Sequence, residues 1–300
     1  LEYVGVTDSE LDDATYEAAE KQYLDNNSSK AIDLFNGYIA RFSTGKQLIK
    51  AHFYLAELYS KSDLSANALP HYTFVCEQST NEFTETALLK SSEIVLASDT
   101  YDTALQLLSR LELEANNPQN RLYAQSNLMK TYFQLENYDA AIRYAELILG
   151  NSKTDAYIKS DAYIIIARAA MKTDNETKAR LAYAQVKTIA TGEMGAEAQY
   201  FEAYFNYVDG NHEASNESVQ VLIKKFSSYK YYASKGLVIM AKNFQALDDV
   251  FQATYILENV IQNFAEFKEV ANEAQIELER IKTEAAKTNA SIEVETENEN

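Results

Sequence analysis

The 300-residue chain is poor in the two residue types that make tight turns, with 8 glycines and 2 prolines. Together they form about 3% of the chain, whereas an average protein contains roughly 12% of these two residues. Such a sequence cannot supply the many turns of a β-sandwich, a barrel or a propeller, and it is not collagen-like. Tryptophan is absent, which removes the largest stacking surface that a carbohydrate-binding protein could use. These shortages favour a mostly helical protein.

Cysteine and basic residues are also scarce, and each shortage excludes a class of protein. Cys76 is the single cysteine, so the chain can form no internal disulfide and no thiolate metal cluster. With 27 basic against 45 acidic residues, the formal net charge is −18, which repels phosphate backbones and anionic membranes. The longest apolar run, residues 162–167, is far shorter than the ~20 residues that a membrane helix needs. We therefore expect no nucleic-acid partner and no membrane-spanning segment.

The chain does contain abundant apolar material, 46% of its residues, and this material is arranged in repeats. A small residue near the start of a predicted helix recurs every 36–38 positions, at Ala31, Ala68, Ala104, Ala141, Ala179, Ser215 and Ala253. Four and seven residues after each of these anchors, all fourteen residues are apolar or aromatic, the spacing of one helical face. Five residues before each anchor stands a residue suited to a turn: Asn26, Asp63, Asp99, Glu136, Asp174, Gly210 and Asp248. The pattern predicts seven helix–turn–helix units.

This pattern resembles the tetratricopeptide repeat (TPR), which has a small residue within its first helix, an aromatic three residues later, and alanine at the start of its second helix. The best match comprises Ala56, Tyr59, Ala68, Leu69, Tyr72 and Val75. The usual closing proline is missing, and the period exceeds the typical ~34 residues. The resemblance implies an all-α fold, a right-handed α-solenoid of about seven TPR repeats with a C-terminal capping helix.

The slightly long repeats, with segments such as residues 35–42, look like those of bacterial cell-envelope members of the family. Those members include the lipoproteins of outer-membrane protein assembly and the periplasmic partner of the Tol-Pal system. This narrower resemblance implies a periplasmic or cell-envelope location rather than a cytoplasmic one.

The sequence divides into four segments. Residues 1–13 show no repeat unit, and one interpretation is a stub of upstream repeats. Residues 14–264 form the predicted solenoid, and residues 265–288 carry the single apolar stripe of an amphipathic capping helix. Residues 289–300 are acidic and without pattern, which predicts a disordered tail.

Residues that could carry catalysis do not form a recognisable constellation. The chain has no P-loop, no GxGxxG, no HExxH and no serine-hydrolase elbow. We assign His52, His71 and His212 to a first helix, a second helix and a turn of separate repeats, where they share no metal site. Cys76 falls on the core-facing part of a helix, which favours a buried, inert thiol. We therefore expect no enzymatic activity, no cofactor and no metal.

The resemblance implies a concave groove lined by the first helix of each repeat, in which a protein or peptide partner lies. The residue after the small first-helix residue faces this groove, and it is Glu20, Glu57, Glu93, Lys130, Arg168, Tyr204 and Lys242 in successive repeats. We infer a groove that is negative at its N-terminal end and positive at its C-terminal end. Tyr200 and Tyr207 flank Tyr204 at helical spacing and complete the candidate partner-binding set. A solvated face with incidental aromatics is the competing interpretation.

Two classes of function follow from this groove. The first is a non-enzymatic scaffold for protein–protein interaction that binds a partner segment, in a cell-envelope assembly if the narrower resemblance holds. The alternative is a helical protein that binds a small ligand or glycan on its tyrosine-rich surface. For the scaffold we expect that Arg168→Glu combined with Lys242→Glu weakens partner binding without changing the melting temperature. The sequence leaves the identity of the partner and the oligomeric state open.

Overall fold

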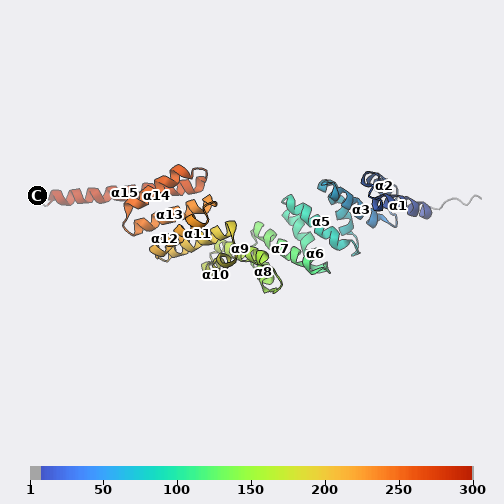
Figure 1. The fold of residues 1–300 in the computed structure, drawn as a ribbon, viewed down its shortest axis with the longest axis horizontal. Coiled ribbons are helices and arrows are strands. Elements are labelled where there is room, and N and C mark those ends of the chain that lie inside the picture. Colours follow the sequence, from blue (N-terminus) through green and yellow to red (C-terminus); the bar gives the residue numbers. More distant parts are fainter. Residues whose placement is uncertain (1–7, 299–300) are drawn as a thin grey trace, which may run out of the picture. The chain divides into compact units, whose positions relative to one another are not determined.

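The computed structural model describes residues 8–298, and within them all regular secondary structure is α-helical (Figure 1). The first helices of the pairs are α1 (Asp8–Leu24), α3 (Leu48–Lys61), α5 (Thr84–Ala97), α7 (Pro118–Gln134), α9 (Ala156–Lys172), α11 (Gly192–Val208) and α13 (Lys230–Ala246). The second helices are α2 (Ser28–Arg41), α4 (Ser65–Glu77), α6 (Tyr101–Glu114), α8 (Tyr138–Gly150), α10 (Glu176–Ile189), α12 (His212–Lys225) and α14 (Val250–Asn263). A single helix, α15 (Lys268–Asn298), follows the seventh pair. The predicted all-α solenoid of about seven helix pairs plus a capping helix is confirmed.

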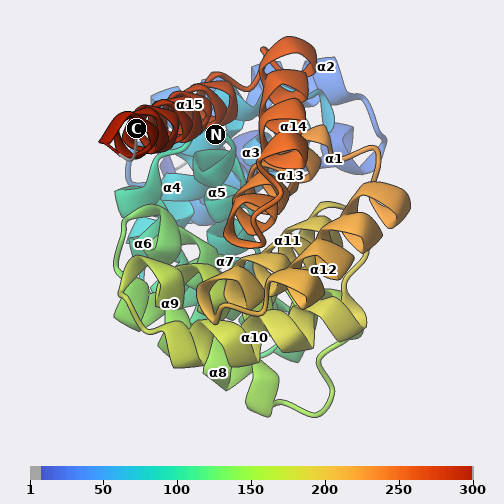
Figure 2. The ribbon, with the colours of Figure 1, turned by 90° about the vertical axis from the view of Figure 1, so that its left-hand side faces the viewer.

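The helices form two compact units, residues 1–144 and residues 145–300, and the division falls within α8. In the first unit two apolar clusters hold the pairs together, one around Phe35 and Tyr38 and the other around Tyr72 and Leu108. In the second unit α11 and α12 pack side by side, and α13 and α14 pack on the beginning of α15 (Figure 2). No helix within the described range has both the length and the apolar character needed to cross a bilayer.

The repeated apolar positions predicted from the sequence form the core of both units. Every second helix begins three residues before its anchor, so all seven share one register. All seven anchors, and all fourteen residues four and seven positions after them, are buried, with Tyr183 the most exposed at 2%. This agreement follows from helix geometry, because positions 0, +4 and +7 lie on one face and each pair must bury that face against its neighbour.

The predicted turn positions adopt one conformation throughout the array. Asn26, Asp63, Asp99, Glu136, Asp174 and Asp248 have φ between 52° and 63°, and Gly210 has φ of 76°. In every turn the N–H of the next residue donates to the carbonyl five residues earlier, as Asn211 does to Asn206. This is the closing bond of a Schellman motif, which satisfies the last carbonyls of the first helix. Asn, Asp and Gly tolerate the left-handed region, which explains how an array of helix pairs can contain so little glycine and proline.

Two segment boundaries differ from those expected. α1 begins at Asp8 rather than near residue 14, and the Asp12 carboxylate is buried, accepting hydrogen bonds from the Tyr38 hydroxyl at 2.6 Å and the Lys46 amide at 3.0 Å. Residues 8–13 therefore belong to the first pair, and residues 1–7 lie outside the described range. At the other end α15 continues to Asn298, through most of the segment expected to be disordered, because no glycine or proline interrupts it.

Candidate functional site

The acidic candidates of the first unit already have partners within that unit. Glu20 accepts a hydrogen bond from the Tyr16 hydroxyl at 2.7 Å, and Glu57 accepts one from the Tyr72 hydroxyl at 2.5 Å. Burial and the adjacent carboxylate raise the pKa of both phenols. Glu93 forms an ion pair with the lysine three residues earlier. The raised pKa values keep the hydroxyls of Tyr16 and Tyr72 protonated as donors to Glu20 and Glu57.

Lys130 is exposed on α7 and is the fourth candidate in the first unit. The other five, Arg168, Tyr200, Tyr204, Tyr207 and Lys242, belong to the second unit. All three aromatic candidates therefore lie in the second unit, on α11.

In the second unit the odd-numbered helices share one register. α9, α11 and α13 each contain 17 residues, and Arg168, Tyr204 and Lys242 are the thirteenth residue of each. The sixth residues of α11, α13 and α15 are Glu197, Lys235 and Glu273. The two positions meet across neighbouring odd helices, because Arg168 pairs with Glu197 at 2.6 Å and Lys242 pairs with Glu273 at 2.6 Å. We call each such pairing of a thirteenth with a sixth residue a rung.

The first rung is part of a buried polar network around Glu197, whose side chain is 4% exposed. The Arg168 guanidinium donates to both carboxylate oxygens, from Nε at 3.0 Å to Oε1 and from Nη2 at 2.6 Å to Oε2. The hydroxyls of Tyr183 and Tyr232 donate to the same carboxylate at 2.9 and 2.7 Å. Burial alone would raise the pKa of Glu197, but the Arg168 bonds and charge, with the two hydroxyls, hold it below its usual range. The carboxylate therefore stays ionised inside the protein.

These pairings contradict the inference of a positive C-terminal end. The charges of Arg168 and Lys242 are each compensated by a carboxylate on the next odd helix. The expected double variant, Arg168→Glu with Lys242→Glu, should lower the melting temperature instead of leaving it unchanged, since the new carboxylate at position 168 would face buried Glu197. Sequence reasoning missed Glu197 because it assigned only the residue after the small first-helix residue, with Tyr200 and Tyr207, to the groove. The sixth residue is charged in α9, α11, α13 and α15, as Asp161, Glu197, Lys235 and Glu273, and this column of the second unit is the signal that could have found Glu197.

The three candidate tyrosines on α11 are not equivalent. Tyr200 is 7% exposed and packs against Phe201, with ring centroids 5.1 Å apart. Its ring is part of the core and offers little surface to a partner. Tyr204 and Tyr207 are half-buried, and Tyr204 rests edge-on against the ring of Phe205 at 5.6 Å. These two rings are held by packing and still reach solvent.

Lys235, the sixth residue of α13, contacts aromatic rings, whereas Arg168 and Lys242 each contact a carboxylate. Its Nζ lies 4.9 Å from the centroid of the Tyr200 ring and 5.5 Å from that of Tyr231. Among the described residues 8–298 no carboxylate lies within 4.0 Å of this ammonium group. We call the surface formed by Arg168, Tyr204, Tyr207, Lys235 and Lys242 the odd-helix face.

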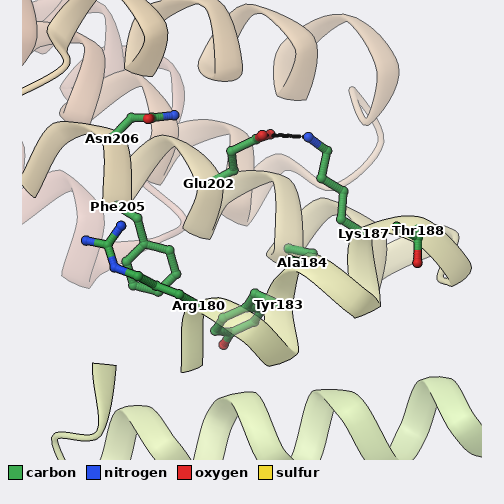
Figure 3. Close-up of a pocket in the computed structure, with 9 residues that line it drawn as sticks. Arg180, Tyr183, Ala184, Lys187, Thr188, Glu202, Phe205 and Asn206 are labelled. Carbon is green, nitrogen blue, oxygen red and sulfur yellow. Dashed lines mark hydrogen bonds and ion pairs between the residues drawn. The ribbon is translucent and has the colours of Figure 1, made fainter. Parts of the chain in front are cut away.

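A separate hollow of about 500 Å³ lies between α10 and α11 (Figure 3). The guanidinium of Arg180 covers the ring of Phe205 at 4.5 Å and binds both oxygens of Asp209 at 2.8 Å. Lys187 pairs with Glu202 across the hollow at 2.6 Å. Both cations are compensated, so the hollow presents aromatic and aliphatic surface with a neutral polar border.

The assignment of the histidines to separate repeats is wrong. His52 on α3 and His71 on α4 belong to one helix pair, and their Nδ1 atoms lie 2.9 Å apart. Burial and the neighbouring imidazole lower the pKa of His52 to about 4, and burial lowers the pKa of His71. Within the described part of the chain, no group of three or more His, Cys, Asp or Glu residues gathers to hold a metal.

No protein-family model matches the chain, and no curated protein matches it by sequence. Among solved structures, the C-terminal part of a TPR repeat-containing protein from Cytophaga hutchinsonii is similar, with a TM-score of 0.59, 15% identity, and coverage of 86% of this chain and 98% of that one. A tetratricopeptide repeat protein from Parabacteroides merdae matches 88% of this chain and 98% of its own length at 14% identity and a TM-score of 0.44. The Cytophaga structure shows that the chain has the fold of a tetratricopeptide-repeat array.

Proposed function

We propose that the protein is a non-enzymatic scaffold whose odd-helix face binds a segment of a partner protein. The observation that carries the proposal is the combination of rigid support and accessible aromatic surface on this face. Rungs between neighbouring odd helices fix their spacing, while Tyr204 and Tyr207 remain half-exposed on rings already immobilised by packing. Immobilised tyrosines lose little entropy on binding, and they bury a large ring while the hydroxyl stays hydrated.

The experiment compares proteins retained by the immobilised full-length chain and by two tyrosine variants. Tyr204→Ala removes an aromatic group from the odd-helix face, whereas Tyr255→Ala removes one that is 58% exposed on α14. We expect a protein that is retained by the wild type and by Tyr255→Ala but is lost from Tyr204→Ala. Melting curves establish that both variants are folded. If no retained protein depends on Tyr204, the odd-helix face is not the binding surface.

The resemblance to cell-envelope members of the family supports a cell-envelope assembly as the setting of this interaction. The test is the location of the endogenous protein after fractionation of its source cells. Recovery with the envelope fraction supports the proposal, and recovery with the cytoplasmic fraction opposes it.

The hollow between α10 and α11 supports the second candidate, binding of a small ligand or glycan. Its volume of about 500 Å³ lies in the range of small-molecule sites, and its compensated charges suit an uncharged ligand. A glycan array probed with the wild type and with Phe205→Ala tests this candidate. Binding that disappears in Phe205→Ala supports it, and the absence of any bound glycan rejects the glycan form.

A further inference from the structure

The odd-helix face contains one position at which the rung pattern is incomplete. In the rungs on either side, the thirteenth residue is a cation and the sixth residue of the next odd helix is a carboxylate. Between α11 and α13 the thirteenth residue is Tyr204 and the sixth is Lys235. The cation is present, but its counterpart is a phenol, which carries no charge at neutral pH. This rung therefore lacks a carboxylate.

Resting on the proposed function, we infer that the partner segment is acidic and supplies the missing carboxylate to Lys235. An Asp or Glu side chain of the partner would accept hydrogen bonds from the Lys235 ammonium group beside the rings of Tyr200 and Tyr231. Tyr204, at the other position of the same rung, would contact the aliphatic part of that residue. The site thus favours a partner residue that offers both a carboxylate to Lys235 and an aliphatic portion to the ring of Tyr204.

The local charge balance supports an acidic occupant although the chain as a whole is strongly negative. At physiological salt, charges interact over about 8 Å, so the nearest groups determine the potential at Lys235. Glu197 and Glu273 form ion pairs with Arg168 and Lys242, so neither of these carboxylates is the partner of Lys235. Glu269 is the competing group, because its charge contributes to the raised pKa of both rings that Lys235 contacts, Tyr200 and Tyr231.

The aromatic surroundings strengthen the same inference. The two rings confine the lysine side chain, so less entropy is lost when its ammonium group binds a carboxylate. A cation held over rings keeps its hydrogen-bond donors, which a carboxylate can use and a neutral side chain uses less well.

The test is selection from a random dodecapeptide phage library on the immobilised full-length protein. We expect the wild type to select peptides enriched in Asp and Glu, and Lys235→Met to lose this enrichment while its melting curve is unchanged. Synthetic copies of the selected peptides should bind Lys235→Met about tenfold more weakly than the wild type, the loss expected for one charge-assisted hydrogen bond. Lys235→Arg should keep the preference, and Glu269→Gln should tighten binding by removing the competing carboxylate.

Lys224→Met is the matched control, since it makes the same charge change on α12 at an exposed lysine away from this face. The inference is overturned if the wild type selects no excess of Asp and Glu, or if Lys235→Met selects the same excess. If selected peptides depend on Tyr204 but show no preference for acids, the proposed function survives and the acidic partner does not. If no peptide is selected by the wild type, both fail together.

Discussion

Replacing Arg168 and Lys242 by methionine compares two ion pairs of identical register and different burial. Methionine preserves most of the aliphatic part of each side chain and removes the charged group with its hydrogen-bond donors. The side chain of Glu197 is 4% exposed, whereas that of Glu273 is 45% exposed. Burial is therefore the main variable between the two substitutions.

The expected losses of stability differ by several-fold. Removing one partner of a buried pair costs about 3–5 kcal/mol, because the other charge is left without compensation. Arg168→Met should cost somewhat less, about 2–4 kcal/mol, since Arg168 is itself 38% exposed and two tyrosine hydroxyls still bind Glu197. Lys242→Met breaks a pair whose carboxylate reaches water, and exposed pairs contribute about 0–1 kcal/mol.

Urea unfolding followed by circular dichroism measures both losses as shifts of the transition midpoint. A double variant, Arg168→Met with Glu197→Gln, should recover part of the first loss, because glutamine is neutral and can still accept from the tyrosines. Equal losses for Arg168→Met and Lys242→Met would refute the reasoning, as would a double variant less stable than Arg168→Met alone.

Three further predictions concern the turns, the histidine pair and the packing between helices. Glu136 is the single left-handed turn residue that is neither Asn, Asp nor Gly, so Glu136→Gly should raise stability by about 0.5–1 kcal/mol in thermal melts, and Gly210→Ala should lower it by about 1 kcal/mol. The pKa of His52 is lowered to about 4, so an unfolded chain binds a proton that the folded chain rejects between about pH 6.5 and pH 4. As the pH falls from about 6.5 to about 4, the free energy of unfolding should therefore drop by about 1–2 kcal/mol more in the wild type than in His52→Asn. Parallel pH profiles of the two proteins would contradict this. A Cβ on Gly236 would lie 2.9 Å from a methyl carbon of Leu222, so Gly236→Ala should destabilise by about 1–3 kcal/mol in urea unfolding.

The repeat positions could be predicted from the sequence because each is determined within one helix pair. The small residue at the anchor, the apolar residues four and seven positions later, and the turn residue between the two helices all act over a few residues. The same local reasoning predicts the left-handed turns, since Asp63 and Asp174 each have a positive φ, which aspartate tolerates better than most residues.

The candidate site was predicted less completely because it depends on contacts between pairs. Arg168 and Glu197 are 29 residues apart, and they meet only because α9 and α11 stack in register. The charge of Arg168 alone indicated a positive surface, and only its partner shows that this charge is compensated. The contact of His52 with His71 is different in kind, since a separation of 19 residues within one pair was visible in the sequence.

The register of the odd helices also explains how α15 ends the array within the described residues. Its sixth residue, Glu273, completes the rung from Lys242, so α15 occupies the place of an eighth first helix. The twelfth residue of α9, α11 and α13 is alanine, and this small side chain lets the second helix of the pair approach closely. The twelfth residue of α15 is Glu279. A glutamate at that crossing opposes the packing of another second helix. Arg280, the thirteenth residue, pairs instead with Glu277 and Glu284 of its own helix, so the cation that would extend the ladder is compensated within the cap.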